Sequence, residues 1–221
     1  DMVNLTRIYT RTGDAGETRL SDLSATTKTD PRVAAYGDVD EANSILGIVT
    51  ALDALPQPLI VTLRTIQNEL FDVGADLSNP VVPDPTWEPL RITQPSIDRL
   101  EAWCDEYTEG LSSLASFILP GGTQSSAYLH LARTVVRRAE RSAWAAAQVY
   151  GLDDDVTVAS GGLNPLAIAY LNRLSDLLFI LARVANSGHD VMWVPGKDRE
   201  PAGERARKHR ARIEAAQQSD S

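Results

Sequence analysis

Hydrophobic residues recur every three to four positions along most of the chain, which is the period of α-helices that turn one face to a core. The stripe is clearest in residues 57–77, where leucine, isoleucine and valine supply it. A run without proline or glycine, residues 123–150, is rich in the helix-favouring residues Ala, Leu, Arg and Glu. Three further helices are predicted at 31–52, at 94–110 and from about residue 164, each with a proline in its first turn.

The last of these helices, which begins near Asn164, is apolar on most of its sides, so we expect it to lie at the centre of a helical bundle. No internal repeat and no sustained heptad pattern is visible. Before the first helix, residues 7–10 form a short β-type run that leads into a glycine-containing loop. The sequence thus predicts an all-α fold, a bundle of about five helices over residues 1–195, followed by a polar, basic tail at 196–221.

Composition narrows the class of protein. The 221 residues are enough for one substantial domain with its own core. The net charge of −9 argues against general nucleic-acid binding. The single cysteine, Cys104, excludes an internal disulfide and a cluster of cysteine metal ligands. No apolar run approaches the length of a membrane helix and the start has no signal-peptide pattern, so we expect a cytoplasmic protein that does not bind membranes.

The most unusual polar stretch is R-T-V-V-R-R-A-E-R, residues 133–141. On a helix Arg133, Arg137 and Arg141 stand four residues apart, so their guanidinium groups share one face, with Glu140 beside them. Three stacked arginines repel one another unless something anionic lies against them, either acidic side chains from elsewhere or a polyphosphate. An ordinary solvated helix face is the alternative, because charged runs usually lie on the surface.

A second stretch with phosphate-binding character is T-G-D-A-G, which holds Gly13 and Gly16. Two glycines this close let backbone N–H groups turn toward one point and cradle phosphate oxygens. The stretch is not a Walker A loop, because no G-K-[ST] follows and no long helix begins at once. Lys28, on the polar segment that follows, is a further candidate phosphate contact. An everyday turn and a solvated lysine are the alternative.

Several polar residues interrupt helices that are otherwise apolar. Asp40 lies in the first helix and is a candidate partner for one of the arginines, or else a solvated acid near a helix end. Asn172 and Asp176 stand four residues apart in the last helix, and we expect the arginine helix to supply their partners. Phe117, just before the turn that leads into the arginine helix, is either a core residue or the wall of a pocket.

Five motifs carry a resemblance to a known family, in the order Y-T-R-T-G-D-A-G-E-T, Y-G-D-V-D-E-A-N-S, F-I-L-P-G-G-T, R-T-V-V-R-R-A-E-R and Y-L-N-R-L-S-D-L-L-F. Over residues 5–195 they resemble the PduO-type ATP:cob(I)alamin adenosyltransferases. The resemblance implies a five-helix bundle that assembles as a homotrimer, with active sites between neighbouring subunits. It also implies transfer of the 5′-deoxyadenosyl group of ATP to the cobalt of reduced cobalamin, with release of triphosphate and with Mg²⁺ as the metal.

The family's ATP-binding positions carry over residue by residue. The resemblance implies that one subunit contributes the N-terminal loop and a lysine, which match Thr10, Arg11, Thr12, Gly13, Asp14, Gly16, Thr18 and Lys28. It implies that the neighbouring subunit contributes the positions that match Arg137, Arg138, Glu140, Arg141 and Asn172. Arg11 stands where lysine is common, which keeps the charge but alters the phosphate geometry. Ala42 stands where leucine is common, which affects packing only.

The resemblance also implies which residues act in the reaction itself, namely Arg133, Arg137, Asp40, Phe117 and Asp176. Arg133 resembles the arginine that pairs with an acid across the interface, and that acid matches Asp40. Asp176 matches a further acid of the site. Phe117 resembles the aromatic residue that lies under the corrin and displaces the lower cobalt ligand, and Trp193 matches the cobalamin-binding side. The direct metal ligands are left open.

The chemistry of such a transfer agrees with the residues. Displacement of triphosphate from a 5′ carbon requires stabilisation of negative charge, which arginines, Lys28, loop amides and Mg²⁺ supply. No general base is needed, because the cobalt itself is the nucleophile. Two alternatives remain open: a protein that binds adenosylcobalamin and delivers it to a client enzyme, and a non-catalytic helical assembly module whose arginines form only interface salt bridges. A B12-dependent client enzyme and a cobalamin reductase are candidate partners.

Overall fold

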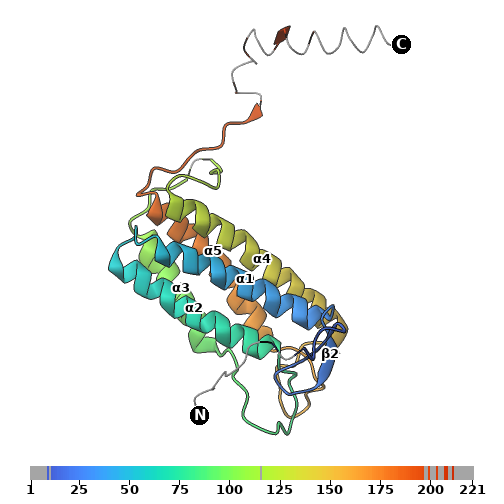
Figure 1. Ribbon diagram of the computed structural model, residues 1–221. Coiled ribbons are helices and arrows are strands. Elements are labelled where there is room, and N and C mark those ends of the chain that lie inside the picture. The colour runs from blue at the N-terminus through green and yellow to red at the C-terminus, as the bar shows by residue number, and fades with distance from the viewer. Residues whose placement is uncertain are drawn as a thin grey trace, which may run out of the picture. The chain divides into compact units, whose positions relative to one another are not determined.

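The computed structural model describes residues 9, 11–114, 116–196, 199, 203, 207, 208 and 211. Within them the chain forms five α-helices and one two-stranded sheet (Figure 1). The helices are α1 (Pro31–Ala51), α2 (Gln57–Leu77), α3 (Gln94–Thr108), α4 (Gln124–Tyr150) and α5 (Pro165–Ala185), and the strands are β1 (Glu17–Arg19) and β2 (Ala25–Thr27). All five predicted helices are present with ends within two residues of those predicted, so the bundle is confirmed.

The chain divides into two compact units. The first comprises Asp1–Ser113 and Pro120–Val191 and holds all the helices and strands named above. The second comprises Leu114–Leu119 and Met192–Ser221, and within it Ile118 and Met192 form an antiparallel bridge. Most of the predicted tail, and all of the predicted β-type run at 7–10 except Tyr9, lie outside the described residues. The predicted domain boundary after residue 195 therefore stays a prediction.

The helix starts follow the chemistry of the residues before them. Asp30, Thr123 and Asn164 stand directly before α1, α4 and α5, and each side chain accepts a hydrogen bond from an amide in the first turn of its helix. Such a cap satisfies an N–H group that the helix itself leaves unbonded. At its other end α4 stops at Gly151, whose φ of 85° turns the chain away. These signals are local, which is why the sequence predicted the helix ends well.

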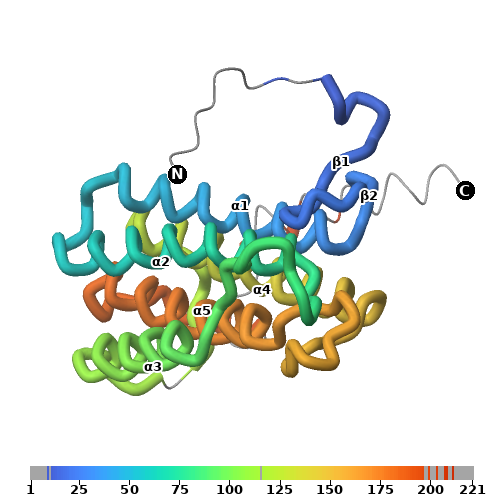
Figure 2. Tube along the Cα trace, turned by 90° about the horizontal axis from the view of Figure 1, so that it is seen from below, coloured from blue at the N-terminus to red at the C-terminus, as the bar shows by residue number. Residues whose placement is uncertain are grey.

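Helix α5 lies centrally in the bundle, where α2, α3 and α4 all pack against it (Figure 2). Its fully buried side chains include Tyr170, Leu171, Leu174, Leu177, Leu178 and Leu181. Helix α1 packs against α2 and α4. The prediction that no apolar run approaches the length of a membrane helix was wrong. Among the helices of the described residues, α5 alone is long and apolar enough to cross a membrane. However, 56% of its apolar window is buried, as in a core helix.

A short hairpin that the sequence did not predict precedes α1. Its strands pair antiparallel, with Thr18 opposite Thr26. The hairpin is fixed to the bundle through Asp30, whose Oδ2 accepts hydrogen bonds from Thr26 Oγ1 at 2.5 Å and from the Tyr150 hydroxyl at 2.6 Å. Burial alone would raise the pKa of Asp30, but these bonds and the one from the Arg32 amide lower it overall.

Arg32 is buried next to this carboxylate. Its guanidinium donates to the backbone oxygens of Leu77, Gly161 and Gly162. Its Cζ also lies 4.6 Å from the centroid of the Tyr150 ring. The side chain thereby joins the start of α1 to the end of α2, the end of α4 and the loop before α5. This well-connected end of the bundle carries the hairpin and the glycine loop.

Candidate active site

Helix α4 carries the three arginines that were predicted to share one face. Arg137 and Arg141 are exposed, and Arg133 is half-buried. The Nη1 of Arg141 donates to the Arg137 carbonyl at 3.1 Å, one turn earlier. Within the described part of the chain none of the three forms an ion pair with an acid. The arginine row, meaning these three residues, therefore carries positive charge that the described residues of its own chain do not neutralise.

Arg133 is the most constrained member of the arginine row. Its Nε is buried and has no hydrogen-bond partner among the described residues. Burial, and after it the charge of Arg137, lowers the pKa of Arg133. A buried donor without an acceptor typically costs about 1–3 kcal/mol. An acceptor supplied from outside this chain would therefore stabilise the side chain.

Arg138 points to a different partner, the acids of α1. Its Nε lies 3.0 Å from Asp38 Oδ1, and its Nη2 bonds to Glu41. The hydroxyl of Ser142 donates to the other oxygen of Asp38 at 2.6 Å. The hydrogen bond to Asp38 is the main reason that the pKa of Arg138 is raised. Sequence reasoning missed both acids, although their spacing of three residues in α1 places them on one helix face.

Asp40 lies away from the arginine row of its own chain. It is exposed and lines a groove of about 430 Å³ between α1 and α2, together with the exposed Phe71. Among the described residues it forms no ion pair. Asp40 and Arg133 are thus both without a charged partner in the described part of their own chain.

The polar pair of α5 meets two different partners. Asn172 Nδ2 donates to Glu140 Oε1 on α4 at 3.0 Å. The predicted partner helix is therefore the right one, although the partner is the glutamate rather than an arginine. Asp176 instead pairs with Arg173 of its own helix at 3.1 Å, and Arg173 also binds Glu101 of α3 at 2.9 Å. The expectation that α4 supplies the partner of Asp176 does not hold within this chain.

The glycine loop and Lys28 come together at the hairpin. The Lys28 amide donates to the Gly16 carbonyl at 2.8 Å. A Cβ added to Gly13 would lie 3.2 Å from Lys28 Nζ, so the ammonium group lies against the loop backbone. Gly16 has a φ of 86°, which side chains rarely tolerate, and Arg11 also has a positive φ of 62°. The hairpin register therefore gathers three of the predicted phosphate-binding positions at one point.

The remaining loop positions are placed less closely. Thr18 lies within β1, and the Asp14 amide donates to the Arg11 carbonyl at 3.5 Å. Thr12 is exposed, and the predicted position Thr10 lies outside the described residues.

The loop and the arginine row are separate features within one chain. Among the described residues, Gly13, Gly16 and Lys28 make no hydrogen bond or ion pair with the row. Tyr150, which ties the hairpin base to α4, is nine residues beyond the last arginine, which corresponds to about 14 Å of helix. Figure 2 shows the loop before β1 extending away from the helices.

The second unit holds both predicted cobalamin-binding residues. The rings of Phe117 and Trp193 pack edge to face, with centroids 6.0 Å apart and an interplanar angle of 75°. The Trp193 amide donates to the Phe117 carbonyl at 2.8 Å. The Phe117 side chain is 79% exposed. Two residues far apart in the sequence thus form one exposed aromatic pair, as a wall for a large apolar ligand requires.

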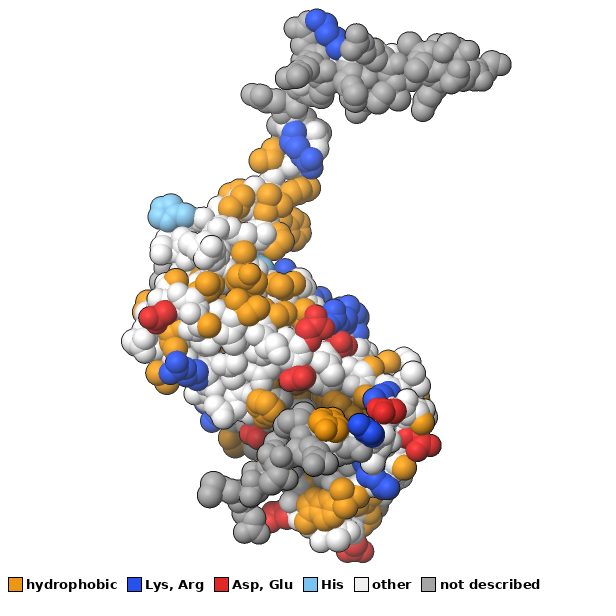
Figure 3. Space-filling model, viewed as in Figure 1, with side chains coloured by type: hydrophobic (Ala, Val, Ile, Leu, Met, Phe, Trp, Pro, Cys, Tyr) orange, Lys and Arg blue, Asp and Glu red, His pale blue; other side chains and the backbone are white. Residues whose placement is uncertain are grey.

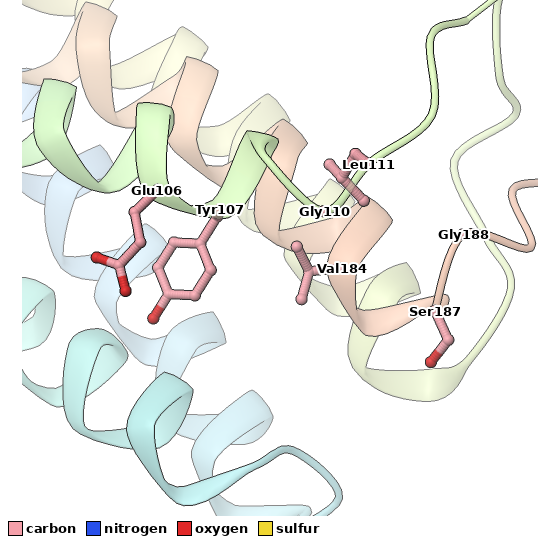
Figure 4. A pocket seen from close by; sticks show the side chains of 7 residues that line it. All are labelled: Glu106, Tyr107, Gly110, Leu111, Val184, Ser187 and Gly188. Carbon is pink, nitrogen blue, oxygen red and sulfur yellow. The ribbon is translucent and has the colours of Figure 1, made fainter.

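A pocket of about 430 Å³ lies where α3 and α5 end. Figure 4 shows the side chains that line it, which include Glu106, Tyr107, Val184 and Ser187. It contains none of the predicted site residues, and the Tyr107 hydroxyl already bonds to Thr62 Oγ1 at 3.0 Å. This pocket is therefore not the candidate active site.

Metal ligands were left open by the sequence. Within the described residues no group of three or more His, Cys, Asp or Glu side chains is placed to hold a metal ion. Mg²⁺ in nucleotide sites is commonly bound by one or two carboxylates together with phosphate oxygens and water. Glu140, beside the arginine row, is a carboxylate that fits such a set.

Comparison with known proteins decides between the open alternatives. A family model described as "Cobalamin adenosyltransferase" matches residues 8–185, which is most of the chain. The chain belongs to this family. A corrinoid adenosyltransferase of Mycobacterium tuberculosis is 58% identical over 197 residues, covering 89% of this chain and 97% of that protein. A cobalamin adenosyltransferase of Cupriavidus metallidurans is 43% identical over 192 residues, covering 86% and 95%.

Solved structures of the family have the same bundle. A variant of a PduO-type ATP:corrinoid adenosyltransferase from Lactobacillus reuteri, complexed with cobalamin and ATP, superposes with a TM-score of 0.73 at 37% identity, covering 86% of this chain and all of that one. Another variant from the same organism, complexed with ATP, gives 0.71 at 36% identity. The resemblance to PduO-type enzymes is thereby confirmed. The roles of individual site residues stay predictions.

Proposed function

We propose that this protein transfers the 5′-deoxyadenosyl group of ATP to the cobalt of reduced cobalamin and releases triphosphate. The observation that carries this function is the arginine row of α4, which forms no ion pair with any described acid in a member of the cobalamin adenosyltransferase family. A triphosphate leaving group concentrates negative charge, and a fixed row of guanidinium groups is suited to bind it.

The triphosphate is held from two sides in this proposal. Arg137 and Arg141 bind phosphate oxygens from α4, while the loop amides near Gly13 and Gly16 and the ammonium of Lys28 bind them from the hairpin. The contact between Glu140 and Asn172 supports the arginine row from α5 and fixes its neighbouring carboxylate. These groups act on the charge that develops as the carbon–oxygen bond breaks, so they lower the barrier rather than only improve binding.

The site is completed by a second copy of the chain, and the assembly is a homotrimer. In the part of one chain that the structure describes, Gly13, Gly16 and Lys28 make no hydrogen bond or ion pair with the arginine row, and Arg133 and Asp40 each lack a charged partner. Figure 3 shows hydrophobic side chains over the first half of α4, beside basic and acidic groups over α4 and α1. Leu131, in the first half of α4, is 46% exposed. An apolar patch next to unpaired charge is typical of a subunit interface.

Magnesium fits this arrangement as a substrate-bound ion. Glu140, beside the arginine row, would be the carboxylate that holds it, directly or through water, together with phosphate oxygens. When bound, the ion neutralises part of the triphosphate charge. The direct ligands remain open in this proposal.

The aromatic pair of the second unit serves the cobalamin. Phe117, with Trp193 against its ring, presents an apolar surface that excludes water and a lower axial ligand from the cobalt. Loss of that ligand makes the cobalt easier to reduce, so the nucleophile forms at this surface. His130 takes no part as a base: it is buried in the bundle, and burial lowers its pKa. Reductase, client enzyme and cytoplasmic location stay predictions.

The test is an adenosylation assay with purified protein, ATP, Mg²⁺ and chemically reduced cobalamin under anaerobic conditions. The visible spectrum should change to that of adenosylcobalamin, and triphosphate should appear in equal amount. If the protein binds cobalamin without this spectral change, it acts as a delivery protein and not as an enzyme. If it binds neither substrate, it is a non-catalytic assembly module.

A further inference from the structure

The chain passes between its two units at three places: after Ser113, before Pro120 and after Val191. The second unit holds Phe117 and Trp193, the aromatic pair described above. The helical unit is joined to the aromatic pair through the chain only at these three passages.

Arg183, in the last turn of α5, holds two of the passages. Its Nη2 donates to the Ser112 carbonyl at 2.8 Å, just before the first passage. Its Nε bonds to Asp190 Oδ2 at 2.8 Å, just before the third. The Arg183 and Asp190 side chains are only 8% and 4% exposed. Because water is largely excluded, this ion pair is held more firmly than a surface pair.

Asn186, the residue that ends α5, holds the remaining passage. Its Oδ1 accepts from the Thr123 amide at 2.9 Å, and its Nδ2 donates to the Gly121 carbonyl at 3.0 Å. A Cβ on Gly122, whose φ is 108°, would lie 2.2 Å from Asn186 Oδ1, so the amide closes tightly on this turn. The Nδ2 is also 3.5 Å from Asp190 Oδ1, which joins both contacts into one cluster. Figure 1 shows the start of α4 beside the end of α5.

We propose that Arg183, Asn186 and Asp190 form one anchor that positions the aromatic pair for cobalamin. They are positioning residues, since they act through the chain passages and need not touch a substrate. This inference rests on the proposed function, and within it on the cobalamin role of Phe117. The anchor also grips the start of α4, but the arginine row begins ten residues later, about 15 Å along the helix. Loss of the anchor is therefore expected to affect cobalamin more than ATP.

The experiment uses the full chain with Asn186→Ala and Asp190→Asn, each in the adenosylation assay. Both variants should raise KM for cobalamin and lower kcat by about tenfold, because each removes hydrogen bonds from a buried cluster. KM for ATP should change by less than about twofold. The visible spectrum of bound, half-reduced cobalamin should show a smaller fraction without its lower ligand. Asp190→Asn keeps the side-chain volume and gives the same readout if Asn186→Ala does not fold.

The matched control is Asn68→Ala, an exposed asparagine of α2 whose side chain bonds, among the described residues, only to the Arg64 carbonyl at 2.8 Å. It should behave as the unaltered protein. Anchor variants with unaltered cobalamin KM and spectrum would overturn the inference, as would equal increases in KM for both substrates. If Phe117→Ala impairs cobalamin use and the anchor variants do not, only the anchor fails. If the unaltered protein forms no adenosylcobalamin, the proposed function itself fails.

Discussion

Arg137→Ala is the sharpest test of the arginine row. Arg137 is exposed and forms no ion pair among the described residues, and both Arg133 and Arg141 carry like charge near it on the same face. Removing its guanidinium therefore takes nothing from the packing of the bundle and relieves some repulsion. The free energy of unfolding should stay within about 0.5 kcal/mol of the unaltered value, as for other exposed positions.

The loss in catalysis follows from the bond to phosphate. A hydrogen bond to a charged group contributes about 1.5–3 kcal/mol. If that bond forms fully in the transition state, kcat/KM for ATP should fall about 10- to 150-fold, at 1.36 kcal/mol for each factor of ten. If the planar guanidinium group forms a second hydrogen bond to phosphate, its removal should lower turnover below detection.

The assay compares initial rates of adenosylcobalamin formation with thermal unfolding of the same preparations. Arg137→Lys keeps the positive charge but loses the planar guanidinium group. Its kcat/KM should therefore lie between that of the unaltered protein and that of Arg137→Ala. Arg64→Ala, an exposed arginine of α2 remote from the arginine row, is the matched control and should leave kcat/KM unaltered. An Arg137→Ala variant with normal kcat/KM, or one that loses activity only because it unfolds, would refute the reasoning.

Three further outcomes are expected. Phe117→Ala should lower kcat more than ATP affinity, and a pure loss of ATP binding would contradict its cobalamin role. Asp40→Ala should weaken the trimer in sedimentation and lower activity with it, because it removes the proposed partner of Arg133; an intact, fully active trimer would speak against that pair. Burial lowers the pKa of His130 below its usual 6.5, so its stabilising effect is present above pH 6.5 and is lost as the pH falls. His130→Leu should flatten this decline in urea unfolding between pH 7.5 and 5.5, and an unaltered slope would disprove it.

The helices could be predicted closely because their signals are local. Asp30, Thr123 and Asn164 cap their helices through side chains that act within one turn. The hairpin was missed because its strands have three residues each, too few for an alternating pattern to stand out. The contact of Thr26 and Tyr150 with one carboxylate fixes the hairpin to the bundle, and Tyr150 lies 120 residues away from that acid in the chain. Contacts at such separation leave no mark in a single sequence.

Which acid meets which arginine could not be predicted for a similar reason. The sequence places Asp38, Asp40 and Glu41 within one turn of α1, and all three are plausible partners for α4. The rotation of α1 against α4 selects Asp38 and Glu41 for Arg138 and turns Asp40 toward α2. The resemblance to a family, rather than helix periodicity, is what singled out Asp40. Its role depends on a second chain, which periodicity does not describe.

The single chain breaks local rules in the places where the proposed site lies. Among the described residues it leaves a buried donor of Arg133 without an acceptor, a row of like charges without acids, and Asp40 exposed in a groove beside an exposed Phe71. The buried donor and the row of like charges cost stability in isolation, and replacing one arginine by glutamine would relieve part of the repulsion. The buried carboxylate of Asp76, in contrast, has partners within its own chain: it accepts hydrogen bonds from Arg91, the Ile92 amide and Asn164. The two costly features and the exposed Asp40 are accounted for together if an adjoining copy and a polyphosphate supply the missing partners.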